Sequence, residues 1–148
     1  GEEEILAYKK FCIGKNFKKE EKFTIGSLTF STHINKHGVE AYSIKVTNEE
    51  GKTIVYTGDT GYYSELPEFC KDANILVAEA SCYEYERGRM SGHMTAIEAA
   101  TVAKEGNVDT LVLTHLPHHG DIEDLLKEAN IAFDKEILLA KYDLIIEV

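Results

Sequence analysis

The sequence predicts one α/β domain, a mixed sheet with about three helices that lie mostly on one face. Three observations lead to this prediction. The chain has 148 residues, the usual size of a single domain. Its first third is rich in β-branched and aromatic segments separated by turns, and the rest alternates short apolar runs with helical patterns. An apolar share of 43% and a charged share of 28% are typical of a globular protein.

The first third is predicted to be a β-meander. Residues 23–30 form an extended stretch with Gly26-Ser27 at its centre, which indicates a hairpin. Further strands are expected at 41–46 and 53–56, joined by a turn. Residues 1–22 mix Lys and Glu with few apolar side chains and are treated as a poorly defined N-terminal segment, so the domain is placed at 23–148.

The remaining two thirds are predicted to alternate strand and helix. Four short apolar runs indicate strands, at 75–78, 110–113, 137–140 and 144–146. Three segments begin with residues that favour helix N-caps and predict helices: Ser64 toward Lys71, the capping box Thr95–Glu98 as far as Glu105, and Asp121 as far as Phe133.

Charge and cysteine content limit the possible functions. Sixteen Lys and Arg against 26 Asp and Glu give a formal charge of -10, which argues against a protein that binds a phosphate backbone through bulk positive charge. No apolar run is long enough to span a membrane, and the first residues lack a targeting pattern. Cys12, Cys70 and Cys82 are odd in number and lack Cys-X-X-Cys spacing, so we expect a cytoplasmic protein without disulfides.

Polar residues follow several of the predicted strands. Asp59 comes after 54–56, His115 comes after 111–113, and His37 lies near the start of another strand. Enzymes of the α/β class place reactive groups at strand ends, and His and Asp are common ligands of zinc. From the residues alone, a simple turn role for Asp59 beside Gly58 remains an alternative.

Four sequence blocks occur in a characteristic order: Lys36–Tyr42 (KHGVEAY), Tyr56–Thr60 (YTGDT), Ser91–Ala96 (SGHMTA) and Leu113–Leu116 (LTHL). With the segment Glu79-Ala80-Ser81, they resemble the metallo-β-lactamase fold hydrolases, and within that superfamily the ribonuclease Z-like phosphodiesterase branch. The resemblance runs from Phe23 to Val148 and corresponds to the C-terminal half of that fold. It implies one half of a four-layer α/β/β/α sandwich.

The resemblance also implies roles for individual residues. His37 and His115 would each bind one of two metal ions, with Asp59 as the bridging ligand. The catalytic residues would be Asp59 and His93, the latter contacting the scissile phosphate or the leaving group. Glu79 would be either an orienting residue or an ordinary buried acid. No ligand block contains His33, His118 or His119. Exposed loop positions are expected for His118 and His119.

The sequence lacks the His-X-His-X-Asp-His motif that supplies most of the family's metal ligands. We therefore expect an apolar sheet face that is covered by a separate N-terminal half of the fold or by a second copy of this chain in a homodimer. The chain alone is expected to be weakly active or inactive. The implied cofactor is zinc, two ions in the complete fold, with manganese or iron as alternatives.

The expected activity is a metal-dependent hydrolysis of a small phosphodiester or ester by an activated water molecule. Transfer RNA is disfavoured as a substrate, because only a short turn (47–53) stands where ribonuclease Z enzymes carry a long arm, and because the net charge is -10.

Whether the chain is an enzyme is left open. One alternative is a non-catalytic metal-binding or assembly module that retains the fold. Another is an α/β domain with incidental histidines, in which His37, Asp59 and His115 would lie apart.

Overall fold

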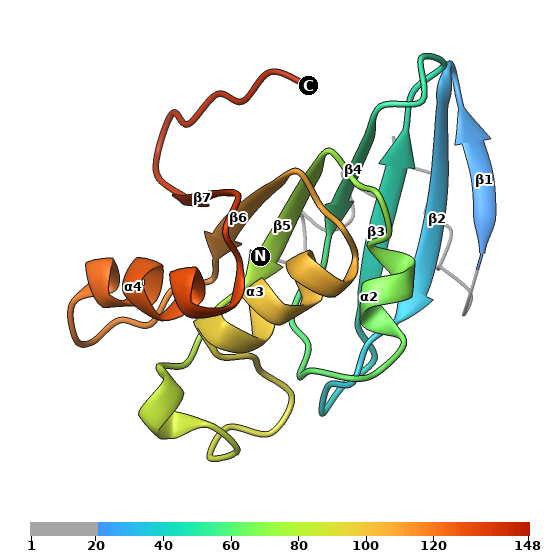
Figure 1. Ribbon diagram of the computed structural model, residues 1–148. Helices are drawn as coiled ribbons and strands as arrows, with labels where there is room; N and C mark the ends of the chain where they lie inside the picture. The colour runs from blue at the N-terminus through green and yellow to red at the C-terminus, as the bar shows by residue number, and fades with distance from the viewer. Residues whose placement is uncertain (1–20) are drawn as a thin grey trace, which may run out of the picture.

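Seven strands form one mixed sheet in the computed structural model, which describes residues 21–148 (Figure 1). The strands follow the chain order β1 to β7 across the sheet. Pairing is antiparallel from β1 to β4 and parallel from β4 to β7. Their bounds are β1 Lys22–Ile25, β2 Leu28–Ile34, β3 Tyr42–Thr47, β4 Thr53–Tyr56, β5 Ile75–Glu79, β6 Thr110–Thr114 and β7 Glu136–Leu139. Most of the segment predicted to be poorly defined, 1–20, lies outside the described residues.

The helices of the described part lie on one face of this sheet (Figure 1). They are α2 (Leu66–Phe69), α3 (Ala96–Glu105) and α4 (Ile122–Ala132), with a short 3-10 helix, η1 (Glu84–Glu86), before α3. Sheet residues Val55, Leu76 and Leu111 are fully buried in the core shared with these helices. The predicted α/β class, with about three helices on one face, is confirmed.

Local signals in the sequence explain where several elements begin. The Thr95 hydroxyl accepts a hydrogen bond from the Glu98 backbone N–H, and the Asp121 carboxylate accepts one from Glu123, so both predicted helix caps are confirmed. The first hairpin turns at Gly26, whose φ of 58° is a conformation that glycine adopts without strain.

Two predicted features differ from the structure. Ser64 does not cap α2: its hydroxyl donates to the Glu65 carboxylate at 2.8 Å, and the helix is a single turn that begins after Glu65. The segment 144–146 is not a strand. The chain turns away after β7, which leaves this segment without a neighbouring strand to pair with, and Ile145 is 86% exposed. An apolar run becomes a strand only where a partner backbone is available.

The sheet face opposite the helices has an apolar row. Successive Cα partners across β3 to β7 are Ile44, Tyr56, Val77, Val112 and Leu138. Because side chains alternate along a strand, this row points away from the helices. Tyr56 is 48% exposed. No helix within residues 21–148 is both long enough and apolar enough to cross a bilayer.

Candidate functional site

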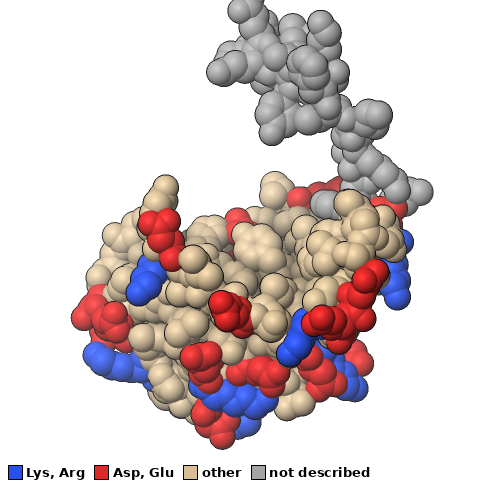
Figure 2. Space-filling model, turned by 90° about the horizontal axis from the view of Figure 1, so that it is seen from above, with Lys and Arg blue, Asp and Glu red and all other residues tan. Residues whose placement is uncertain are grey.

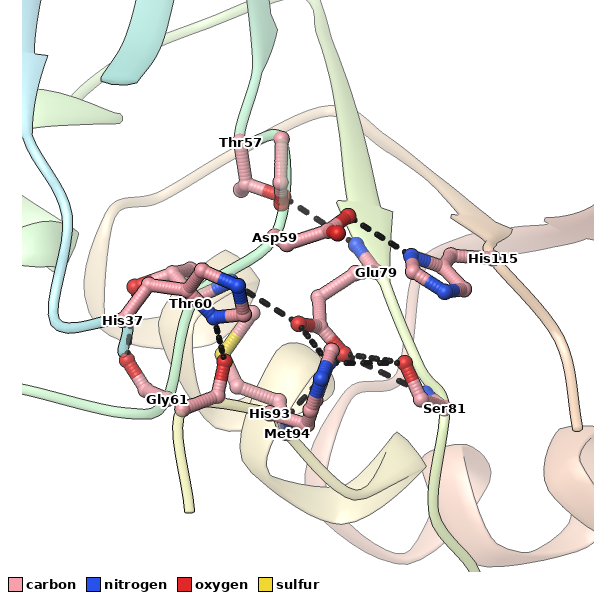
Figure 3. Close-up of polar contacts among 12 residues, drawn as sticks. His37, Thr57, Asp59, Thr60, Gly61, Glu79, Ser81, His93, Met94 and His115 are labelled. Atoms are coloured by element: carbon pink, nitrogen blue, oxygen red, sulfur yellow. Dashed lines mark hydrogen bonds and ion pairs between the residues drawn. The ribbon is translucent and has the colours of Figure 1, made fainter. Parts of the chain in front are cut away.

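The site is built at the edge of the sheet where β4, β5 and β6 end. Asp59 follows β4, and its Oδ1 lies 2.6 Å from Nδ1 of His115, which follows β6 (Figure 3). Two residues in left-handed backbone conformations redirect the chain here, Gly58 at φ 60° and His115 at φ 51°. A side chain on Gly58 would press on the Tyr42 carbonyl at 3.1 Å, so glycine is required at that turn.

His37 reaches the same edge from the loop before β3. Its Nδ1 lies 2.9 Å from the Gly92 carbonyl oxygen and must donate to it, because a carbonyl can only accept. Gly92 has a φ of 87°, and a Cβ placed there would lie 2.7 Å from His37 Nδ1. The close approach of these two loops therefore depends on glycine at position 92.

His93 is the central imidazole of the site. Its ring centroid lies 5.1 Å from that of His37 and 5.5 Å from that of His115, with edge-to-face geometry in both cases. Its Nδ1 lies 2.9 Å from Oε1 of Glu79 and 3.2 Å from the Ser81 hydroxyl. Because an ionised carboxylate can only accept, Nδ1 carries the proton and Nε2 is left free.

Glu79, at the end of β5, is 1% exposed and is surrounded by hydrogen-bond donors. Such a set of donors stabilises an ionised carboxylate inside the protein. Buried charge of this kind holds neighbouring loops in place, since removing it would leave several donors unpaired. Besides His93, the donors to its two oxygens are the backbone N–H groups of Thr60, Ser81 and Met94 and the Ser81 hydroxyl (Figure 3).

The three imidazoles share one arrangement. In His37, His93 and His115, Nδ1 faces a protein oxygen, and Nε2 makes no hydrogen bond with a described residue. Histidines that bind metals or transfer protons are commonly oriented by such an acceptor on the other ring nitrogen. This feature fits both the ligand roles and the catalytic role that the sequence predicts.

The predicted ligands are only partly gathered. Asp59 and His115 adjoin, whereas His37 lies on the other side of His93. Within residues 21–148, no group of three or more His, Cys, Asp or Glu side chains is arranged to hold a metal ion. The donor types suit zinc and similar ions. The number of ligands that this part of the chain brings together does not complete a metal site.

Some positioning residues were not foreseen from the sequence. The Asn35 side-chain amide donates to the carbonyls of Thr57 and Asp59, at 2.7 and 3.0 Å, and its oxygen accepts from the Ser43 hydroxyl. Asn35 thereby fixes the turn that presents Asp59. The Ser81 hydroxyl donates a hydrogen bond to the Glu79 carboxylate and thereby helps to hold it in place. No local pattern marks Asn35, whereas Ser81 belongs to the segment Glu79-Ala80-Ser81 that contributes to the family resemblance.

The other histidines lie outside this cluster. His33 is on β2, where its Nδ1 contacts the Ile34 carbonyl and the Tyr63 hydroxyl. His118 and His119 are in the exposed loop before α4, as expected, and His119 Nε2 lies 3.2 Å from Glu86. Residues predicted as ligands or catalytic groups thus come to one edge of the sheet, and those without such a role do not.

The chain matches a known protein family. The model of the beta-lactamase superfamily domain matches residues 13–116. The chain belongs to the metallo-β-lactamase superfamily. A probable metallo-hydrolase of Bacillus subtilis, YhfI, is 36% identical over 92% of this chain and 55% of its own length. The crystal structure of YhfI, described as a metallo-beta-lactamase fold protein, superposes with a TM-score of 0.83 at 33% identity, over 93% of this chain and 59% of that one.

A ribonuclease Z of Haloarcula marismortui is 40% identical over 62% of this chain and 30% of its own length. The chain thus spans about half the length, or less, of these metallo-β-lactamase superfamily relatives. The expected family is confirmed, and a ribonuclease Z is among the relatives. The alternative of an α/β domain unrelated to this superfamily is excluded.

Proposed function

We propose that the protein is a metal-dependent hydrolase of small phosphodiesters or related esters. The observation that best supports this is the central position of His93, which lies between His37 and His115 with its Nδ1 directed at Glu79. This arrangement combines two candidate ligands with a proton-bearing group at one strand edge. Membership of a superfamily that includes metallo-hydrolases agrees with it.

His93 is the proposed proton donor. With Nδ1 held by the Glu79 carboxylate, the Nε2 atom of the His93 ring is the one that would donate a proton to the departing oxygen of an ester. When the oxygen has left, Nε2 is the acceptor again and Nδ1 keeps its proton. The side chain of His93 is 17% exposed, so the group is shielded from bulk water yet reachable by a substrate.

Asp59, His37 and His115 are the proposed metal ligands of this chain, through the second Asp59 oxygen and the two free Nε2 atoms. Divalent ions bound there would activate water and neutralise developing charge on the substrate. Zinc is the proposed metal, with manganese or iron as alternatives, because imidazole and carboxylate suit all three.

We further propose that the apolar row from Ile44 to Leu138 packs against the N-terminal half of a metallo-β-lactamase fold, or against a second copy of this chain. The exposure of Tyr56 at the middle of the sheet supports such a cover. The missing ligands would come from the covering part, so we expect weak or no activity from residues 1–148 alone. Sedimentation of these residues as a stable, well-folded monomer would argue against this cover.

A small substrate is favoured over transfer RNA. The connection between β3 and β4 is a tight turn in which the Asn48 backbone N–H donates to the Lys52 carbonyl. On the surface seen in Figure 2, basic side chains are interspersed with acidic ones and form no continuous basic patch. A protein that binds the phosphates of a long nucleic acid needs such a patch.

The deciding experiment measures metal content and hydrolysis of bis(p-nitrophenyl) phosphate by residues 1–148, alone and joined to the N-terminal half of a metallo-β-lactamase fold. We expect zinc binding and turnover in the joined protein, with both reduced by Asp59→Ala and only turnover reduced by His93→Ala. Metal content that is unchanged in His37→Ala, Asp59→Ala and His115→Ala would overturn the ligand assignment. Metal binding with no turnover of any ester would instead favour a non-catalytic assembly module.

A further inference from the structure

An open groove lies between β2, β3 and α2. In Figure 1, α2 lies in front of these outer strands, on the side of the sheet that the helices cover. Its volume is about 530 Å³, within the range of small-molecule sites. Ser31, His33 and Lys45 line it from the sheet, and Glu65, Glu68 and Phe69 line it from the helix side, together with Ser64. None of these residues belongs to the strand-end site described above.

The sheet side of the groove presents an unpaired cation. The Lys45 ammonium lies 5.2 Å from the centroid of the Phe69 ring and makes no hydrogen bond or ion pair with a described residue. Burial lowers the pKa of Lys45, while the nearby Glu68 and Asp72 carboxylates act in the opposite direction and favour its charged form. Ser31 is the direct cross-strand partner of Lys45, so its hydroxyl points to the same side. An anion placed here would accept from both groups.

The helix side of the groove presents two carboxylates. Glu65 accepts a hydrogen bond from the Ser64 hydroxyl, which lowers the pKa of Glu65 and keeps it ionised at neutral pH. Among residues 21–148, Glu68 forms an ion pair with the exposed Lys71 at 3.7 Å, an interaction that is readily exchanged. The groove therefore has positive charge on the strand side, negative charge on the helix side and an aromatic ring between them.

We propose that this groove binds a small zwitterion with a carboxylate at one end and an amino group at the other. The ligand carboxylate accepts from Lys45 and Ser31, the amino group donates to Glu65 and Glu68, and the hydrocarbon between them covers the Phe69 ring. Two glutamates repel a phosphate dianion or a dicarboxylate, which distinguishes this ligand from a simple anion. The proposal is independent of the hydrolase function proposed for the strand-end site.

The test is calorimetric titration of the protein with glycine, γ-aminobutyrate and ε-aminohexanoate, with butyrate, butylamine and inorganic phosphate as comparisons. We expect one of the amino acids to bind at least about tenfold more tightly than butyrate or butylamine. Lys45→Met removes the charge and keeps the stem, and is expected to weaken that binding by about tenfold or more. The Glu65→Gln/Glu68→Gln double variant should weaken it as well.

Lys52→Met is the matched control, since Lys52 is an exposed lysine in the β3–β4 turn outside the groove. It should bind the chosen amino acid as tightly as the unaltered protein. Lys45→Arg keeps the charge and should retain binding, and urea denaturation of Lys45→Met shows whether that variant is folded. The proposal is overturned if no amino acid binds at millimolar concentration, if Lys45→Met binds normally, or if butyrate or phosphate binds as well as the zwitterion.

Discussion

Nδ1 of His115 lies 2.6 Å from Oδ1 of Asp59, although 56 positions separate the two residues in the chain. Both side chains are substantially exposed, 45% for His115 and 40% for Asp59. Exposed pairs contribute little to folding. The left-handed conformation of His115 carries a backbone cost for a residue other than glycine, and His115 in this conformation has its ring against Asp59.

Asp59→Asn is expected to separate metal binding from stability. Asparagine keeps the size of the side chain and removes its charge. The free energy of unfolding of the metal-free protein should change by less than about 1 kcal/mol, because the pair is exposed. Metal content should fall, because an amide is a poorer ligand than a carboxylate. Urea denaturation with a chelator present and metal analysis of the purified protein measure the two quantities.

Asp109→Asn is the control for this experiment, since Asp109 is also exposed and forms a long contact of 3.5 Å with Lys135. It should change neither stability nor metal content. A destabilisation of several kcal/mol in metal-free Asp59→Asn, or full metal content, would show that Asp59 is a turn residue and not a ligand.

The outcome at individual residues shows what a single sequence can predict. Thr95 and Asp121 were predicted as caps because a capping residue acts on backbone within its own helix turn. The strand predicted at 144–146 is absent for a different reason, since strand formation there depends on a partner strand that the local sequence does not encode. Asp59 and His115 were found because both follow apolar strands. The role of Asn35 depends on carbonyls more than twenty positions away and has no local signature.

Gly92→Ala is expected to displace His37. The new methyl group would lie 2.7 Å from His37 Nδ1 and would occupy a residue with φ 87°, so both the contact and the backbone oppose it. We expect a loss of roughly 1–3 kcal/mol in unfolding free energy and a movement of the His37 ring. Chemical denaturation measures the first, and the imidazole signals of His37 in NMR spectra report the second.

Gly88→Ala is a closely matched control. Gly88 also has a positive φ, 75°, but an added Cβ there meets nothing within 4 Å. It should show the backbone cost without the effect on His37. If both variants lose the same stability and the His37 signals stay unchanged in Gly92→Ala, the close approach of the two loops does not position His37.

Glu79→Gln tests the buried acceptor. An amide offers one acceptor oxygen where the carboxylate had two, and its NH2 group would face donors such as Met94 N–H and the Ser81 hydroxyl. Leaving buried donors unpaired should cost about 2 kcal/mol or more. The His93 ring should also lose its preference for the tautomer with the proton on Nδ1, which 15N NMR of the imidazole detects.

The control for this change is Glu50→Gln, at an exposed turn position where the charge has no structural role. Its stability should match that of the unaltered protein. If Glu79→Gln also kept its stability and its His93 tautomer, the carboxylate would not be the group that orients His93.

Cys70 is expected to make stability depend on alkaline pH. Burial raises the pKa of its thiol from 9.0 to about 12. In the unfolded chain the thiol ionises near pH 9, whereas in the folded protein it stays protonated, so the unfolded state is favoured as the pH rises above 9. The stability that the protonated Cys70 thiol gives the folded protein is fully present below pH 9 and is progressively lost between pH 9 and pH 12. At pH 10 the loss should be about 1 kcal/mol.

Cys70→Ala removes the thiol and with it this dependence. The cavity it creates lowers stability at every pH. The informative quantity is therefore how the difference in unfolding free energy between the two proteins changes with pH. That difference should shrink by about 1 kcal/mol from pH 8 to pH 10 in urea denaturation, because only the protein with Cys70 loses stability through the thiol. Other groups that ionise in this range and do not interact with Cys70, such as Cys82, are common to both proteins and cancel. A difference that stays constant over these two pH units would mean that the Cys70 thiol ionises as readily in the folded protein as in the unfolded chain.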